Sequence, residues 1–127
     1  MEYNEFITHV QTLTQSDSRE EAERATLAIL KTINELVPDE EMQEIAVQLP
    51  QKLGEILREK ETKSNQSFNL QEFIERASQK ENIKPTTTAI HARAVFSVLQ
   101  SSITPDVFTK FHKYFSHDYE ELFFTSP

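Results

Sequence analysis

The chain has 127 residues, 37% of them hydrophobic, which is enough for one domain to bury its own core. One glycine and five prolines leave little material for β-hairpin turns, and long stretches rich in Glu, Gln, Ala, Leu and Ile favour helices. There is no cysteine, which excludes disulfides, thiolate zinc sites, iron–sulfur ligation and a cysteine nucleophile. We therefore expect a single all-α domain over residues 1–127.

The formal net charge is -8, which disfavours binding to nucleic acid phosphates and to anionic membrane surfaces. The sequence shows neither the basic and apolar pattern of a signal peptide nor an apolar run long enough for a membrane span. We expect an acidic cytoplasmic protein. The charge is unevenly placed, because residues 1–60 carry thirteen acidic and six basic side chains, whereas residues 61–127 carry eight and seven.

Apolar residues recur at helical spacing through the first 58 residues and predict four helices. The first helix opens the chain, and the second begins after Asp17, which can cap it together with Glu20. Pro38 suits the first turn of a third helix, and Pro50 ends that helix and can start a fourth. The residues expected to face the core are Tyr3, Phe6, Ile7, Val10, Leu13, Ala22, Ala25, Ile29, Ile33, Leu36, Met42, Ile45, Ala46, Leu49, Leu53, Ile56 and Leu57.

Four more helices are predicted in the second part of the chain. Asn69 and Glu72 can form a capping box for the first of them, and Pro85 and Pro105 each suit the start of another. Ser116 can cap a last short helix. The expected core positions are Leu70, Phe73, Ile74, Ala77, Phe108, Phe111, Phe115, Tyr119, Leu122 and Phe123.

The helix order and the apolar pattern repeat, which indicates a tandem duplication. The first half is residues 1–58, the second half is residues 68–127, and the polar stretch 59–67 (EKETKSNQS) connects them. EFI at 5–7 falls on EFI at 72–74, Arg24-Ala25 on Arg93-Ala94, Pro38-Asp39 on Pro105-Asp106, and LPQKLGEIL (49–57) on FSHDYEELF (115–123). A helical unit of this size is marginal alone, so the halves should share one core. We expect a compact bundle of about eight short helices whose homologous halves are related by approximate two-fold symmetry.

This layout resembles a bacterial family known as domain of unknown function 2267. The segments that carry the resemblance are YNEFITHV, EEAERATLAIL, QLP (48–50) followed by KLGEIL, EFIERA, HARAVFSVL and DYEELFF. Together they cover almost the whole chain. The second copy departs from the first where Phe115-Ser116 replaces Leu49-Pro50. The resemblance implies no particular activity and assigns no functional residues.

A metal site would have to use the chain's one close histidine pair, His112 and His117. Asp118 and Glu121 could complete such a site. However, a spacing of five residues does not bring two imidazoles onto one helix face, and the expected cap at Ser116 would break the helix between them. We predict no metal site and no cofactor.

His91 is the strongest candidate for a buried titratable group. A helical projection places it between Val95 and Val98, on an apolar face. A buried imidazole usually binds a backbone carbonyl or a hydroxyl, here one such as Ser102 or Thr87. A structural role is favoured over a catalytic one, because the sequence assigns it no second base, nucleophile or orienting carboxylate.

Arg24 and Arg93 occupy matching positions in the two halves. Arg24 projects opposite the apolar stripe, one turn after Glu20 and Glu21, and Arg93 lies in the narrow polar strip of its helix. Duplicated arginines can bind phosphate or carboxylate groups, but no glycine-rich loop or second cation accompanies these. Solvated side chains that flank a core helix are the favoured interpretation.

Seven aromatic residues of the second half lie within a stretch of seventeen positions. They are Phe108, Phe111, Tyr114, Phe115, Tyr119, Phe123 and Phe124. Interleaved with Lys110 and Lys113, they could form a stacking platform for single-stranded nucleic acid, but their spacing is that of a core stripe. Tyr114 and Phe124 fall off the main stripes and are candidates for an exposed contact surface.

These observations favour a non-enzymatic helical scaffold or protein-interaction module, which associates with itself or with an unknown protein partner and binds neither nucleic acid nor membrane. The alternative is a small-ligand-binding protein or enzyme with a pocket between the halves, formed by His91, Arg24 or Arg93. No catalytic, cofactor-binding or metal-binding residue is assigned.

The charge asymmetry adds an expectation about surfaces. We expect the acidic face of the first half to stay solvated or to meet a basic partner, and the more neutral second half to provide any self-association contact. The acidic face includes Glu20, Glu40, Glu41 and Glu44.

Overall fold

The computed structural model describes residues 1–58 and 67–123, and all regular structure within these ranges is helical. This result confirms the predicted all-α class. The predicted connection 59–67 lies almost entirely outside the described residues. The elements, in chain order, are α1 (Tyr3–Thr14), α2 (Arg19–Leu36), α3 (Asp39–Gln48), α4 (Gln51–Arg58), α5 (Leu70–Glu81), α6 (Pro85–Ser102), α7 (Pro105–His112), the 3-10 helix η1 (His117–Tyr119) and α8 (Glu120–Phe123).

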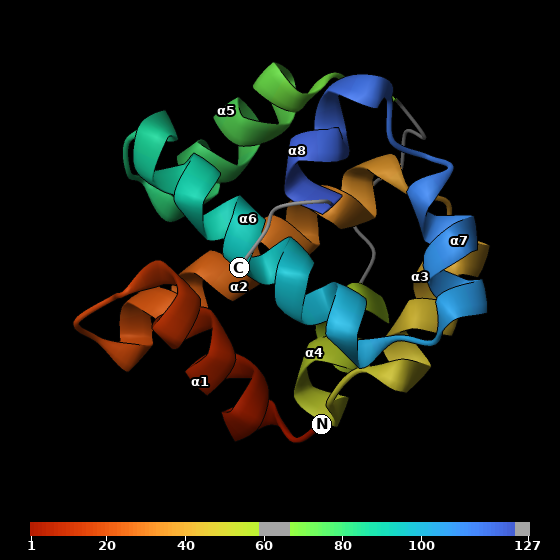
Figure 1. Ribbon diagram of the computed structural model, residues 1–127, viewed down its shortest axis with the longest axis horizontal. Helices are drawn as coiled ribbons and strands as arrows, with labels where there is room; N and C mark the ends of the chain where they lie inside the picture. The colour runs from red at the N-terminus through yellow and green to blue at the C-terminus, as the bar shows by residue number, and fades with distance from the viewer. Residues whose placement is uncertain (59–66, 124–127) are drawn as a thin grey trace.

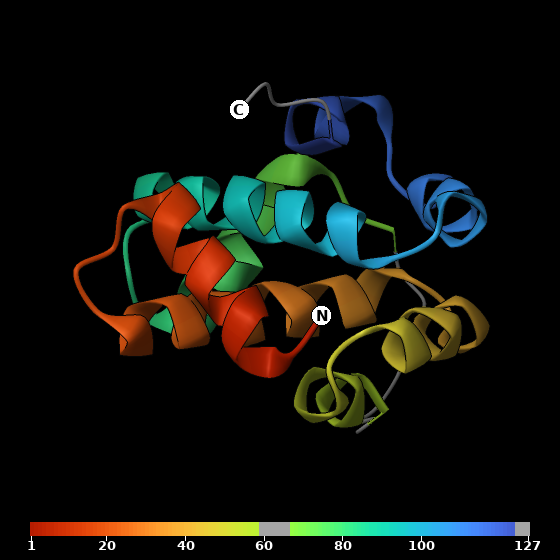
Figure 2. The ribbon, with the colours of Figure 1, turned by 60° about the horizontal axis from the view of Figure 1, so that its bottom comes forward.

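Two long helices, α2 and α6, form the centre of the molecule. Each has 18 residues, and α6 crosses in front of α2 in Figure 1. Viewed from the side, α8, α6, α2 and α4 follow one another through the thickness of the molecule (Figure 2). Helices α1 and α5 each pack against both central helices, and α3 packs against α7 at the opposite end (Figure 1). No helix in the described ranges is long and apolar enough to cross a bilayer.

Polar side chains fix where α2 and α5 begin. Helix α2 is capped by Ser18, whose hydroxyl accepts a hydrogen bond from the backbone N–H of Glu21 at 3.1 Å, so the predicted cap at Asp17 was wrong by one residue. Asn69 caps α5 as predicted, because its Oδ1 accepts from the backbone N–H of Glu72 at 2.9 Å. These caps set the starting points of the helices that carry the buried polar cluster described below.

One apolar core connects both halves. It draws buried residues from α1 to α8, and the predicted core positions Phe6, Ile29, Phe73 and Tyr119 are all fully buried. Predicted positions that instead stay half-buried, such as Phe108, pack against the edge of this core. The prediction was wrong for Leu13, which is 47% exposed near the end of α1. The expectation of a shared core is therefore confirmed.

The second half fills its part of the core with aromatic rings. The ring of Phe96 on α6 lies 5.7 Å from Phe73, 5.6 Å from Phe115 and 5.3 Å from Phe123, with edge-to-face geometry in each pair. Helix α7 ends at His112, so Phe115 lies in the following turn and not in the helix as predicted. Most of the aromatic cluster is core, as its spacing indicated.

Candidate functional site

A buried polar cluster joins α2, α5 and α6. It consists of His91 on the second turn of α6, Glu81 at the last position of α5, and Glu21 in the first turn of α2. The side chains of His91 and Glu81 are each 2% exposed, whereas that of Glu21 is 37% exposed. We call these three residues the Glu–His–Glu cluster.

Both nitrogens of the imidazole contact a carboxylate. His91 Nδ1 lies 2.7 Å from Glu81 Oε1, and His91 Nε2 lies 3.2 Å from Glu21 Oε2. A carboxylate accepts hydrogen bonds, so both contacts are satisfied together when the imidazole is doubly protonated and donates from both nitrogens. The ring then lies between two negative charges, one from each half of the chain.

Local sequence explains how these groups meet. Helix α5 ends at Glu81 because Asn82 adopts a left-handed conformation, with φ of 58°, a conformation that asparagine tolerates better than most residues. Three residues later Pro85 opens α6, which returns the chain past the end of α5 and brings His91 against Glu81. Glu21 reaches the ring from the capped first turn of α2.

The cluster favours the charged form of the imidazole. Burial lowers the pKa of His91, but the hydrogen bonds and negative charges of Glu81 and Glu21 outweigh burial, so the pKa is raised above its usual value of 6.5. Glu81 Oε2 is buried and has no hydrogen-bond partner among the described residues. An unsatisfied buried oxygen of this kind costs on the order of 1–3 kcal/mol, so the cluster is maintained against an energetic penalty.

The structure confirms that His91 is buried but corrects its partners. The prediction named a backbone carbonyl or a hydroxyl such as Ser102 or Thr87, whereas both nitrogens bind carboxylates. Ser102 instead donates to the carbonyl oxygen of Val98 at 2.7 Å. The hydroxyl prediction failed because the projection considered only α6, and the actual partners come from two other helices.

The sequence contained a partial signal for Glu81. It continues the apolar stripe of α5, eight residues after Phe73 and four after Ala77, where a charged residue would be expected to need a partner. Glu21 gave no such signal, because it lies beside other exposed acidic residues at the start of α2.

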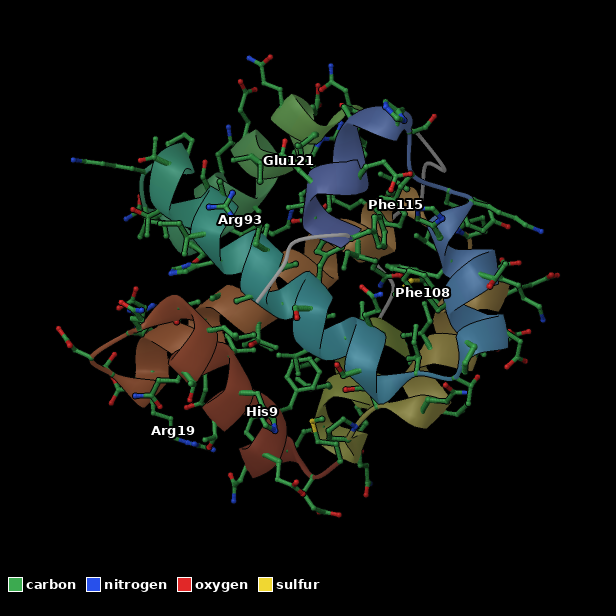
Figure 3. The ribbon with its side chains drawn as sticks, in the orientation of Figure 1. His9, Arg19, Arg93, Phe108, Phe115 and Glu121 are labelled. Carbon is green, nitrogen blue, oxygen red and sulfur yellow. The ribbon has the colours of Figure 1, made fainter. Side chains whose placement is uncertain are left out.

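The other predicted residues do not join the cluster. Arg24 is exposed on α2 and Arg93 is half-buried on α6, and neither forms an ion pair with another described residue. Figure 3 shows Arg93 on the near side of α6, with α2 behind that helix. Tyr114, a candidate for an exposed contact, is instead half-buried against the core. Phe124 lies outside the described residues.

The histidine pair of the second half is separated as expected. His112 ends α7 and His117 begins η1. The ring of His112 stacks on Phe108, with centroids 5.6 Å apart, and its Nε2 lies 3.3 Å from a carboxylate oxygen of Glu120. Figure 3 shows Phe108 and Phe115 between α7 and α8. No group of three or more His, Asp or Glu side chains in residues 1–58 and 67–123 is arranged so that it could hold a metal ion.

A surface depression of about 420 Å³ lies at the turn from α5 to α6. Its lining residues are Ser78, Gln79, Asn82, Ile83 and Lys84. They all belong to the second half, so this depression is not a pocket between the halves. None of the three residues proposed for such a pocket, His91, Arg24 and Arg93, lines it.

The ionic contacts between the two halves, within the described residues, all have their acid and base on the same sides of the boundary. Glu35 pairs with Arg76 at 2.9 Å and with Lys80 at 2.5 Å, and Glu44 pairs with Lys110 at 3.3 Å. Glu21 and His91 form the same type of contact. In each of these pairs the acid comes from the first half and the base from the second. Part of the acidic excess of the first half is therefore met within the molecule.

The family model described as "Uncharacterized conserved protein (DUF2267)" matches residues 3–122. The chain belongs to this family. The match spans both halves and confirms the resemblance seen in the sequence. No curated protein matches the chain. Within this DUF2267 protein, the Glu–His–Glu cluster contains the buried histidine and the buried carboxylate of the described residues, His91 and Glu81.

Proposed function

We propose that this DUF2267 protein is a non-enzymatic helical scaffold or protein-interaction module that associates with a second copy of itself. The observation that carries the proposal is the geometry of His91. Both of its nitrogens bind carboxylates, at 2.7 and 3.2 Å, so the chain's best candidate for a catalytic base is used to join three helices. In this proposal the buried histidine and its carboxylate partners have a structural role.

The repeated helix order supports a duplicated scaffold. The first half has helices of 12, 18, 10 and 8 residues. The second half has helices of 12, 18 and 8 residues, followed by a short final pair. We include in the proposal that the halves are related by approximate two-fold symmetry. A crystal structure in which Arg24 did not superpose on Arg93, and Ala25 on Ala94, would contradict that part.

The charge distribution favours the second half as the contact surface. Two copies approaching through their acidic first halves repel each other, whereas the second halves are nearly neutral. Tyr114 is half-buried against the core, so it is a poor anchor. Ile90 is a better one, because it is 45% exposed on α6.

Light scattering over a range of protein concentrations tests this proposal. We expect the wild type to form a dimer and the Ile90→Glu variant to be monomeric. Val47→Glu is the matched control, because Val47 is also an exposed aliphatic residue, 68% exposed, but lies on α3 in the first half. A monomeric wild type, or equal effects of the two substitutions, would overturn the proposed contact.

A further inference from the structure

The Glu–His–Glu cluster connects the two halves through a contact that depends on one proton. We infer that it is a proton-dependent latch: Glu21 binds His91 while the imidazole carries two protons, and Glu21 turns into solvent when the ring loses one. This inference concerns the response of the fold to pH and is independent of the proposed self-association.

The difference in burial between the two carboxylates decides which proton leaves. Glu81 is 2% exposed and lies 2.7 Å from Nδ1, so it has no access to water that could replace the ring as its donor. A neutral imidazole therefore keeps its remaining proton on Nδ1. Nε2 then carries a lone pair, and the carboxylate oxygen of Glu21, 3.2 Å away, is also an acceptor. Two acceptors at this distance repel each other.

The side chain of Glu21 can rotate when the imidazole loses its proton, because this side chain is 37% exposed. The first turn of α2 does not need to unwind, since its start is held by the Ser18 cap on the backbone N–H of Glu21. Rotation of the carboxylate into water is enough to break the contact with α6. Such a movement removes one polar link between the halves without exposing the core.

The ionisable groups around the ring define the direction of the response. Among the described residues, Glu21 from α2 and Glu81 from α5 are the ionisable groups bonded to His91. The other ionic links between the halves pair Glu35 and Glu44 with arginine or lysine, which keep their charge through the neutral range. The latch is closed at acidic pH and opens as the pH rises through the raised pKa of His91.

The test follows two signals in the full-length chain during one pH titration. Ring ¹⁵N signals report the protonation of His91, and side-chain carboxyl ¹³C signals report the environment of Glu21. We expect both residues to show the same midpoint, above 6.5, with Nε2 and not Nδ1 losing its proton. Separate midpoints, a midpoint below 6.5, or loss of the Nδ1 proton would overturn the latch.

A pair of variants isolates the contribution of Glu21. Glu21→Gln removes the negative charge and supplies an N–H that can donate to the bare Nε2, so the midpoint of His91 should fall and the neutral ring should keep its contact with α2. Glu20→Gln is the matched control, because it removes the same charge one residue away, from an exposed side chain that does not bind His91. Equal shifts of the His91 midpoint in the two variants would contradict the inference.

Discussion

The only glycine of the chain should be essential for the packing of α3 against α4, and Gly54→Ala tests this. A Cβ atom placed on Gly54 would lie 2.5 Å from the backbone oxygen of Ala46, whereas ordinary contacts begin at 3.4 Å. The obstructing atom belongs to the backbone of α3, so no side-chain rotation can relieve the clash. Helix α4 would have to move away by roughly 0.9 Å.

Two opposing effects set the expected magnitude. Replacing glycine by alanine inside a helix stabilises it by up to about 1 kcal/mol through backbone entropy. Overpacking of a buried contact costs about 1–3 kcal/mol, and the upper part of that range applies because a backbone oxygen is involved. We expect a net loss of about 1–2 kcal/mol in the free energy of unfolding, which lowers the melting temperature of a domain of this size by about 3–10 °C.

Thermal and urea unfolding followed by circular dichroism measure this loss. Gln51→Ala is the control on the same helix, because Gln51 is exposed and makes one exposed hydrogen bond to Glu55, at 3.0 Å. Its effect should stay within about 0.5 kcal/mol. A Gly54→Ala protein that melts at or above the wild-type temperature would refute the reasoning, because helix propensity would then outweigh the clash.

Three further substitutions test other contacts. Tyr119→Phe removes a hydroxyl that donates to the carbonyl oxygen of Phe68 at 2.6 Å, and should lower the urea midpoint by an amount equivalent to about 0.5–1.5 kcal/mol; an unchanged midpoint would contradict this role. Ala25→Leu and Ala94→Leu each enlarge a side chain at a buried position, 0% and 4% exposed. Each should lower the free energy of unfolding, measured with denaturant, by about 1–3 kcal/mol, and an unchanged value would exclude close packing at that position. Glu35→Gln removes the acid that pairs with two cations of the second half, and should lower the free energy of unfolding by less than about 1 kcal/mol. This loss should shrink as salt is added, and a loss that salt does not change would argue against an ionic origin.

The two halves also show why corresponding positions are not interchangeable. The proposed alignment of the two halves places Gly54 opposite Glu120 and, with a one-residue gap between Asp39 and Ala46, Ala46 opposite His112. In the first half the backbones at these two positions lie close together, whereas in the second half His112 Nε2 and a carboxylate oxygen of Glu120 lie 3.3 Å apart. Large aromatic residues fill the core near the second pair, for example Phe123, whose ring lies 4.6 Å from that of His112.

The sequence by itself determined the features that depend on interactions between residues close together in the chain. Helix formation depends on contacts within four residues and on caps within three, so apolar periodicity and residues such as Asn69 were enough to predict the all-α class and most helix positions. The burial of His91 was predicted on the same basis, from its place on an apolar helix face. The spacing of the aromatic residues predicted the aromatic core of the second half.

Tertiary structure alone decided which distant groups meet. Glu21 is seventy positions from His91, and Glu44 is sixty-six from Lys110. Nothing within one helical turn of Glu21, Glu44 or Lys110 distinguishes these three from ordinary exposed charges. The pairing of Glu21 with His91 depends on the crossing of α2 with α6, and that of Glu44 with Lys110 on the packing of α3 against α7. A projection of one helix shows which face is buried, but the partner on that face belongs to another helix, and for this reason the carboxylates around His91 emerged only from the folded chain.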